Sequence, residues 1–328
     1  LGSEYRISLK SDSLKDTIPE AVADKIKNMP ETENVYATKY TMGELQISKN
    51  EFFSEEEWSD YFKYQNQEPY YIQRYDGICK QQEDGNYRIK YNVYGYDEAM
   101  IEQLRDFILE GEIQPETIKN NNQVIVTANM DGQGNYFFYG KKPGDTITLR
   151  VPKTENYTDE LLKFQSGEEN YIEKEFEIAA IVNRPLAQEK DFLNTEVWKN
   201  AQSVIMTGEQ MEENFGITDY SFINASPADS ADAKIVSNQL LQVIRDVPKA
   251  VLQDYTTAIA TQKGYLGQQQ IFFSSIAVIL LIISLFHIVN SMSHTILTRR
   301  REYGIIRAIG ITDGGFYKMI LQTGDARI

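Results

Sequence analysis

The sequence contains one cysteine and two histidines in 328 residues. The single cysteine, Cys79, cannot form a disulfide within the chain or supply a cysteine-based zinc site. Both histidines, His287 and His294, lie in or beside a long apolar segment, so the rest of the chain has no histidine that could act as a general base. The nucleophile-elbow and zinc-protease motifs are also missing. The sequence therefore predicts a non-catalytic protein that needs no metal and no cofactor.

Positive charge is the next shortage. The chain has 33 Lys and Arg residues against 48 Asp and Glu residues, a net charge of −15. Such a surface repels phosphate, which argues against a nucleic-acid partner. The overall composition, 41% hydrophobic and 25% charged, is typical of a folded protein, and the length allows about two domains.

Charge of either sign disappears for 35 residues, Gly264–Thr298. Within this stretch, Ile271–Met292 is a 22-residue run dominated by Ile, Leu, Val and Phe. A helix of that length measures about 33 Å, which is enough to cross a hydrocarbon core of about 30 Å. Core helices of soluble proteins rarely stay uncharged for so long. The run predicts a membrane helix.

The flanks of this run predict its orientation. Arg299, Arg300 and Arg301 follow it directly, and the tail from residue 299 onward carries a net charge of +3 while residues 1–298 carry −18. Positively charged flanks stay in the cytoplasm. We expect a protein of the cell membrane with one visible span, a large extracytoplasmic N-terminal portion and a cytoplasmic C-terminus. Because the chain begins at Leu1, we also expect that a preceding segment is missing.

Two similar β-α-β patterns lie at opposite ends of the portion before the span. The first has a strand at Tyr5–Lys10, a helix that Thr17 caps, and a strand at Asn34–Ile47. The second has strands at Phe222–Ala225 and Ala250–Tyr255 around a helix that ends near residue 245. Two such units far apart in the chain predict a split α+β domain that closes by pairing its halves.

The residues between these units predict a strand-rich inserted subdomain. It opens with an acidic and aromatic stretch, residues 49–75, and contains a predicted helix at Asp97–Glu110 and a polar, mobile loop at Pro152–Asn170. The aromatic residues Tyr94, Tyr96 and Tyr136–Tyr139 fit either a recognition surface or the ordinary preference of aromatic residues for strands. The expected strands are Tyr87–Val93, Gln123–Ala128, Tyr136–Tyr139, Thr146–Val151 and Phe176–Val182.

The segment just after the span carries the most specific pattern in the chain. It reads Arg299-Arg300-Arg301-Glu302-Tyr303-Gly304-Ile305-Ile306-Arg307-Ala308-Ile309-Gly310, after Val289-Asn290-Ser291-Met292. This resembles the second-helix signature of FtsX-like permeases, with a late Asn, an R-x-x-E-x-G cluster and then R-A-x-G. Looser similarities to the outer core domain of MacB-type ABC transporter permeases lie at Val93–Tyr96, Leu109–Glu112, Pro143–Ile147 and Phe176–Val182.

The resemblance implies an architecture and a partner. Such permeases have a split α+β "porter" part, an inserted strand-rich part, and a separate or fused ATPase whose ATP-driven dimerisation moves the outer domains mechanically. Carried over to this chain, the expected parts are a porter-like subdomain in halves 1–48 and 218–256, an insertion at 49–217, a stalk and span at 257–298, and a cytoplasmic coupling segment at 299–328. The coupling positions would be Arg301, Glu302, Gly304, Arg307 and Gly310.

The residues themselves allow two interpretations of this segment. Ile305, Ile306 and Ile309 make a short apolar face suited to a partner's groove, and the arginines can pair with partner carboxylates. The arginines could instead only anchor the helix at the lipid headgroups. After Leu321-Gln322 the family pattern continues into a third span, whereas this chain continues with the polar segment Thr323–Ile328. We expect either a truncated permease or an unrelated tail in place of the remainder.

Three roles remain open from the sequence. The first is a permease subunit of an ATP-driven mechanotransmission exporter of peptides, lipopeptides or lipoproteins, with an ABC-type ATPase and a second permease copy or paralogue as partners. The second is an extracellular module that activates a cell-wall hydrolase. The third is a sensor whose acidic outer portion attracts cationic antimicrobial peptides. The sequence names no cargo, organism, ATPase or oligomeric state.

Overall fold

The fold comes from a computed structural model. It describes residues 3–11, 13–49, 69–130, 136–155, 157–164, 167–186, 203–315 and 317–319. Most of the acidic and aromatic stretch predicted at residues 49–75 therefore lies outside the described residues. The chain divides into two compact units, which we call the N-terminal unit (Leu1–Thr256) and the helical unit (Thr257–Ile328).

Four strands of the N-terminal unit form a layer in the order β13-β1-β12-β2. Strand β1 (Tyr5–Leu9) lies between β12 (Phe222–Pro227) and β13 (Ala250–Asp254) and pairs antiparallel with both. Strand β12 also pairs antiparallel with the beginning of β2 (Thr32–Ile47). The two predicted β-α-β patterns therefore do meet in one sheet, which we call the four-stranded layer.

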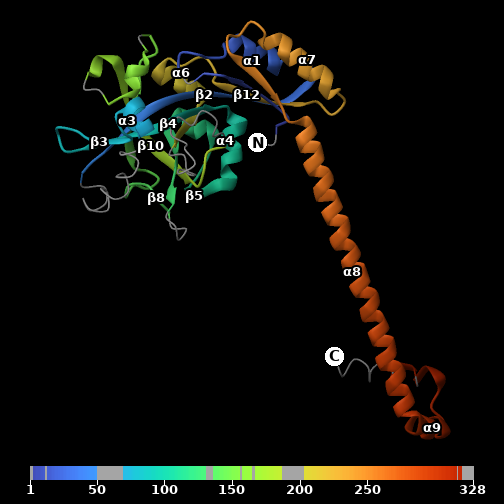
Figure 1. Cartoon of the computed structure of the whole chain (residues 1–328). Helices are drawn as coiled ribbons and strands as arrows, with labels where there is room; N and C mark the ends of the chain where they lie inside the picture. Colours follow the sequence, from blue (N-terminus) through green and yellow to red (C-terminus); the bar gives the residue numbers. More distant parts are fainter. Residues whose placement is uncertain are drawn as a thin grey trace. The chain divides into compact units, whose positions relative to one another are not determined.

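Two helices cover this layer. Helix α1 (Glu20–Lys27) and helix α7 (Ala233–Ile244) lie beside each other on the same face, as Figure 1 shows at the top of the view. Both present apolar residues at helical spacing to the strands, and burial of that stripe is what holds them there. The shared core includes Tyr5, Ile7, Ile26, Val236 and Leu240, each at most 1% exposed.

Thr17 does not cap α1, contrary to expectation. Helix α1 begins at Glu20, after Pro19, and no side chain caps it. The Thr17 hydroxyl instead donates a hydrogen bond to Asp219 at 2.7 Å. The bridge between Ile18 and Tyr220 keeps the chain extended at this point, so the helix starts later than the local sequence predicts.

A ring of six strands makes up most of the rest of the main sheet in the described residues. Pairing runs β2–β9–β10–β6–β11–β4, and β4 pairs with β2 to close the ring. Strand β2 belongs to both parts: residues up to Thr38 pair with β12, and residues from Lys39 onward pair with β4. The other ring strands are β4 (Tyr87–Tyr96), β6 (Gln123–Thr127), β9 (Thr146–Pro152), β10 (Tyr171–Val182) and β11 (Ser203–Thr207).

Shorter elements surround the ring. Strand β3 pairs with β4, β5 pairs with β10, and β7 and β8 form a separate hairpin. Their bounds are β3 Cys79–Gln81, β5 Ile108–Gly111, β7 Asn129–Met130 and β8 Tyr136–Phe137, with helices α3 Pro69–Tyr75, α4 Glu98–Gln103, α5 Pro115–Asn120 and α6 Gly208–Phe215. Three 3₁₀ helices cover Leu104–Phe107, Asp159–Leu162 and Glu168–Asn170.

Two local predictions are wrong. The helix expected at Asp97–Glu110 ends at Gln103, because residues from Ile108 pair with the edge of β10 and that pairing overrides local helix propensity. The loop at Pro152–Asn170 is not simply polar, since Leu161 and Leu162 are buried and the Tyr171 hydroxyl donates to the Leu161 carbonyl at 2.9 Å.

Four of the aromatic residues considered as a recognition surface form core. Tyr94 and Tyr96 are fully buried, Phe138 and Tyr139 are at most 2% exposed, and the Tyr91 hydroxyl donates to the Tyr139 hydroxyl at 2.9 Å. Aromatic side chains fit the pleated interior of strands and bring large apolar area to it. The alternative of a recognition surface made by these four residues is therefore wrong.

A buried charge cluster crosses three neighbouring strands of the ring. Glu44 on β2 lies directly opposite Lys90 on β4 and Arg150 on β9, at 2.6 and 3.1 Å from their side-chain nitrogens. All three side chains are at most 3% exposed. The Arg150 guanidinium also lies 3.6 Å from the centre of the Tyr171 ring and donates to the Gly167 carbonyl at 2.9 Å. Burial lowers the pKa of Lys90, and the charge of Glu44 opposes that shift.

Replacing the single acid of this cluster tests its energetic weight. Glu44→Gln removes the buried carboxylate that contacts both Lys90 and Arg150, so we expect a loss of about 3–5 kcal/mol in the free energy of unfolding. Glu102→Gln, which removes a solvent-exposed pair with Arg105, is the matched control and should cost at most about 1 kcal/mol. Denaturant unfolding of the detergent-solubilised chain measures both; equal losses would show that the cluster is not desolvated.

The one thiol of the chain is shielded. Cys79 begins β3 and is 5% exposed, and burial raises the pKa of its thiol well above the ordinary value. Because the thiolate is the reactive form, we expect Cys79 to resist a maleimide in the folded chain and to react once the chain is unfolded. Mass spectrometry after timed labelling measures this, and rapid labelling of the folded chain would contradict the placement of β3.

Candidate functional site

Two consecutive helices of the helical unit are separated by a break at one residue. Helix α8 covers Thr256–Thr298, and α9 covers Arg300–Ala308. Arg299 has a φ of −100° and a ψ of 16°, which interrupts the helix between them. Gly310 ends the segment with a φ of +93°, a conformation that other residues rarely adopt.

Helix α8 has the length and composition of a membrane span. Its side chains are not buried in the structure: Ile271 is 69% exposed and Phe286 71%. The hydroxyls of Ser275 and Ser284 donate to the backbone carbonyls four residues earlier, both at 2.8 Å. In lipid these internal bonds satisfy polar groups that would otherwise be costly. A soluble core helix would be buried, so α8 fits the membrane interpretation.

Apolar side chains of α9 lie open to solvent. Ile305 is 58% exposed and Ile309 is 79% exposed, while Ile306 is partly covered. Tyr303, in contrast, is only 8% exposed. Exposed isoleucines on one short helix form a surface that a partner's groove could cover.

The charged coupling candidates differ in their surroundings. Arg307 forms an ion pair with Asp313 at 2.6 Å inside the same unit. Glu302 lies 4.0 Å from Arg299. Arg301 is exposed and has no ion pair within the described part of the chain. Of the candidate cations, Arg301 is thus the better placed to meet a carboxylate from elsewhere.

Gly304 lies in the middle of α9 without an internal reason to be glycine. It is exposed, and an added Cβ would meet nothing within 4 Å. A glycine inside a helix costs about 0.5–1 kcal/mol relative to alanine. That cost is accounted for if another backbone must approach α9 at this point.

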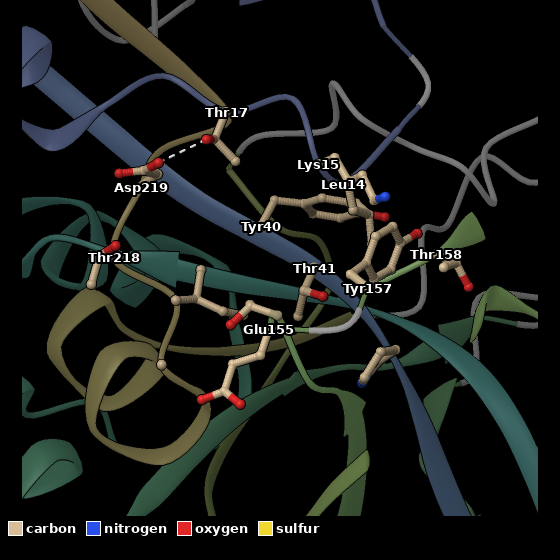
Figure 2. Close-up of a pocket in the computed structure, with 14 residues that line it drawn as sticks. Leu14, Lys15, Thr17, Tyr40, Thr41, Glu155, Tyr157, Thr158, Thr218 and Asp219 are labelled. Carbon is tan, nitrogen blue, oxygen red and sulfur yellow. Dashed lines mark hydrogen bonds between the residues drawn. The ribbon is translucent and has the colours of Figure 1, made fainter. Parts of the chain in front are cut away.

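A second feature lies in the N-terminal unit, where the sequence offered no pattern. It is a pocket of about 640 Å³. Figure 2 shows its two sides: the hydrogen-bonded Thr17 and Asp219 on one, and Tyr157 and Thr158 on the other. Its lining residues come from four stretches far apart in the chain, within 14–17, 40–41, 152–158 and 216–219. No local motif could therefore reveal it.

The described residues hold no group of three or more His, Cys, Asp or Glu side chains that could bind a metal ion. Both histidines lie on α8.

Comparison with known proteins identifies the class of the C-terminal segment. Residues 274–324 match the family model described as FtsX-like permease C-terminal, which confirms the resemblance inferred from the motif. The matched range contains all five candidate coupling residues, but the match assigns them no role.

Two solved structures are similar to the chain. One is the periplasmic region of MacB from Actinobacillus actinomycetemcomitans, with 9% identity, a TM-score of 0.44, and coverage of 80% of this chain and 94% of that one. The other is the extracellular domain of the noncanonic ABC-type transporter YknZ from Gram-positive bacteria, with 8% identity, a TM-score of 0.39, and coverage of 77% and 100%. No curated protein matches the chain at comparable significance.

Proposed function

We propose that this chain is a permease subunit of an ATP-driven mechanotransmission exporter of peptides, lipopeptides or lipoproteins. The observation that carries the proposal is the FtsX-like permease match over residues 274–324, which begins inside the apolar run and includes all of α9. Permeases of this family are typically non-catalytic membrane subunits that function with an ABC ATPase. The exporter role and its cargo belong to the proposal.

The orientation is part of the proposal. The arginines directly after α8 favour a cytoplasmic C-terminus, and the acidic N-terminal unit then lies outside the cell. In this proposal the four-stranded layer is the porter-like part with halves 1–48 and 218–256. The ring of strands is the insertion 49–217, to which β2 adds its residues from Lys39 onward. Residues 257–298 form the stalk and span, and residues 299–328 the coupling segment.

Motion would reach the outside through α8. This helix has 43 residues and measures about 65 Å, without a described interruption. At its beginning, the backbone N–H and the hydroxyl of Thr256 donate to Asp254 at the end of β13, at 3.0 and 2.6 Å. The Tyr255 N–H donates to the Glu4 carbonyl at 2.7 Å, next to β1. A displacement of α9 is thereby passed to the edge of the four-stranded layer.

The coupling segment would meet the ATPase through α9. Ile305 and Ile309 supply the apolar contact, Arg301 supplies a charge, and Gly304 permits close approach. Glu302, Arg307 and Gly310 complete the proposed coupling set; Arg307 acts there together with Asp313, and Gly310 sets the turn after the helix. A second permease copy or paralogue would provide the other half of the transporter.

Recovery of the ATPase with the tagged chain tests this proposal. The chain is co-expressed with a candidate ABC-type ATPase from the same organism. Arg301→Glu and Gly304→Leu are each expected to lower recovery at least about tenfold, because both disturb a desolvated contact. Gly267→Leu and Arg245→Glu make the same changes at exposed positions away from α9; they are the matched controls and should stay near the unmodified level. If both test variants recover full amounts of ATPase while inserted in the membrane, α9 is not the coupling surface.

A further inference from the structure

The pocket of the N-terminal unit lies where β2 passes from one part of the sheet to the other. Ala37 belongs to the core of the four-stranded layer, whereas Tyr40 belongs to the core of the ring. Tyr40 and Thr41 line the pocket immediately after this switch. A ligand held here would therefore contact both parts at once.

The two sides of the pocket come from different parts of the unit. Thr17 and Asp219 flank the bridge between Ile18 and Tyr220, beside the four-stranded layer. Glu155 and Tyr157 follow β9, a strand of the ring. Near the pocket, the exposed hydroxyl of Ser13 donates a hydrogen bond to Asp159 at 3.2 Å and so connects the two sides.

We propose that this pocket binds one or two units of an amino sugar and that the bound ligand ties the four-stranded layer to the ring of strands. The volume of about 640 Å³ lies in the range of small-molecule sites. All the residues that line the pocket belong to the N-terminal unit, so ligand binding there does not depend on the ATPase.

Hydroxyl groups dominate the polar lining. Thr154, Thr158 and Thr218 are exposed and face the pocket with Thr17. A hydroxyl both donates and accepts hydrogen bonds, so a group of them matches a ligand whose own groups do both. Sugar hydroxyls have that property, whereas a phosphate or an alkyl chain does not.

Tyr157 adds a donor without an acceptor. Its side chain is 8% exposed, and its hydroxyl has no hydrogen-bond partner among the described residues. Burial raises the pKa of Tyr157 above its ordinary range, with the charge of Asp159 adding to the shift, so the hydroxyl keeps its proton. A buried hydroxyl without a partner is destabilising, and a ligand oxygen that accepts from it removes this penalty. The hydroxyl is out of contact with solvent, so neighbouring side chains must move aside for the ligand to reach it.

The charges of the lining favour an amine on that ligand. Glu155 and Asp219 face the pocket with a single cation, Lys15. Neither carboxylate has an ion pair among the residues that the structure places. A ring that carries hydroxyl groups and an ammonium group matches both the hydroxyls and the carboxylates of the lining. The carboxylates repel an acidic sugar or a phosphate.

Calorimetric titration of the full chain in detergent tests the site. The probe is the β-1,4-linked disaccharide of glucosamine, at mildly acidic pH where its amines are charged, and cellobiose is the uncharged counterpart. We expect saturable binding of the glucosamine disaccharide and at least about fivefold weaker binding of cellobiose, because a charged hydrogen bond is lost.

Two variants separate a binding role from a structural one. Tyr157→Phe should weaken glucosamine disaccharide binding about five- to tenfold without lowering the melting temperature of the unliganded chain, since it removes a hydroxyl that has no partner. Asp219→Asn should reduce the preference for the charged disaccharide. Tyr136→Phe and Asp246→Asn make the same chemical changes outside the pocket and should leave binding unchanged.

The proposal is overturned by any of three results. They are an absence of saturable binding to the unmodified chain, equal affinity in the Tyr157→Phe and Asp219→Asn variants, and equal binding of trilysine, which would indicate attraction by acidic charge alone. Should Tyr157→Phe fail to fold, Asp219→Asn still decides, through the ratio of the two disaccharide affinities.

Discussion

The account depends on one constraint: a helix surrounded by lipid must satisfy its own backbone and carry no unpaired charge. Helix α8 meets this constraint over Ile271–Met292, which contains no charged residue. Two serine hydroxyls in this stretch donate hydrogen bonds to the helix's own backbone carbonyls. Charge is then confined to the two ends of the helix. The acidic N-terminal unit precedes the span and the arginines follow it. This unequal distribution of charge favours one orientation of the chain in the membrane.

The two parts of the N-terminal unit are joined through a strand that they share. Strand β2 contributes its first half to the four-stranded layer and its second half to the ring, so the two parts share a covalent and hydrogen-bonded strand. Behind this switch, Glu44 links β2 to β4 and β9 through buried ion pairs. Buried pairs contribute little net stability but are costly to separate, which suits a region that must move as one piece. The pocket lies beside this shared strand, where occupation would stiffen the connection.

The sequence was most informative where a pattern is local and long. The span, the two β-α-β halves and most ring strands follow directly from hydropathy and alternation. Ser203–Thr207 and α6 were missed, although Thr207 and Gln210 form a capping box that is visible in the sequence and Gly216 ends the helix at a φ of +68°. The pairing of β5 with β10 shortened a predicted helix, because tertiary pairing outweighs local propensity. The pocket could not be predicted, since four distant segments build it.

The direction in which α8 crosses the membrane can be measured directly. In a Cys79→Ala background, single cysteines replace Asp246, which is 87% exposed in the N-terminal unit, and Tyr317, which is 67% exposed after α9. Intact cells are treated with a membrane-impermeant maleimide, before and after lysis. The account predicts that Asp246→Cys is labelled in intact cells and that Tyr317→Cys is labelled only after lysis. Labelling of Tyr317→Cys in intact cells, or protection of Asp246→Cys until lysis, would contradict it.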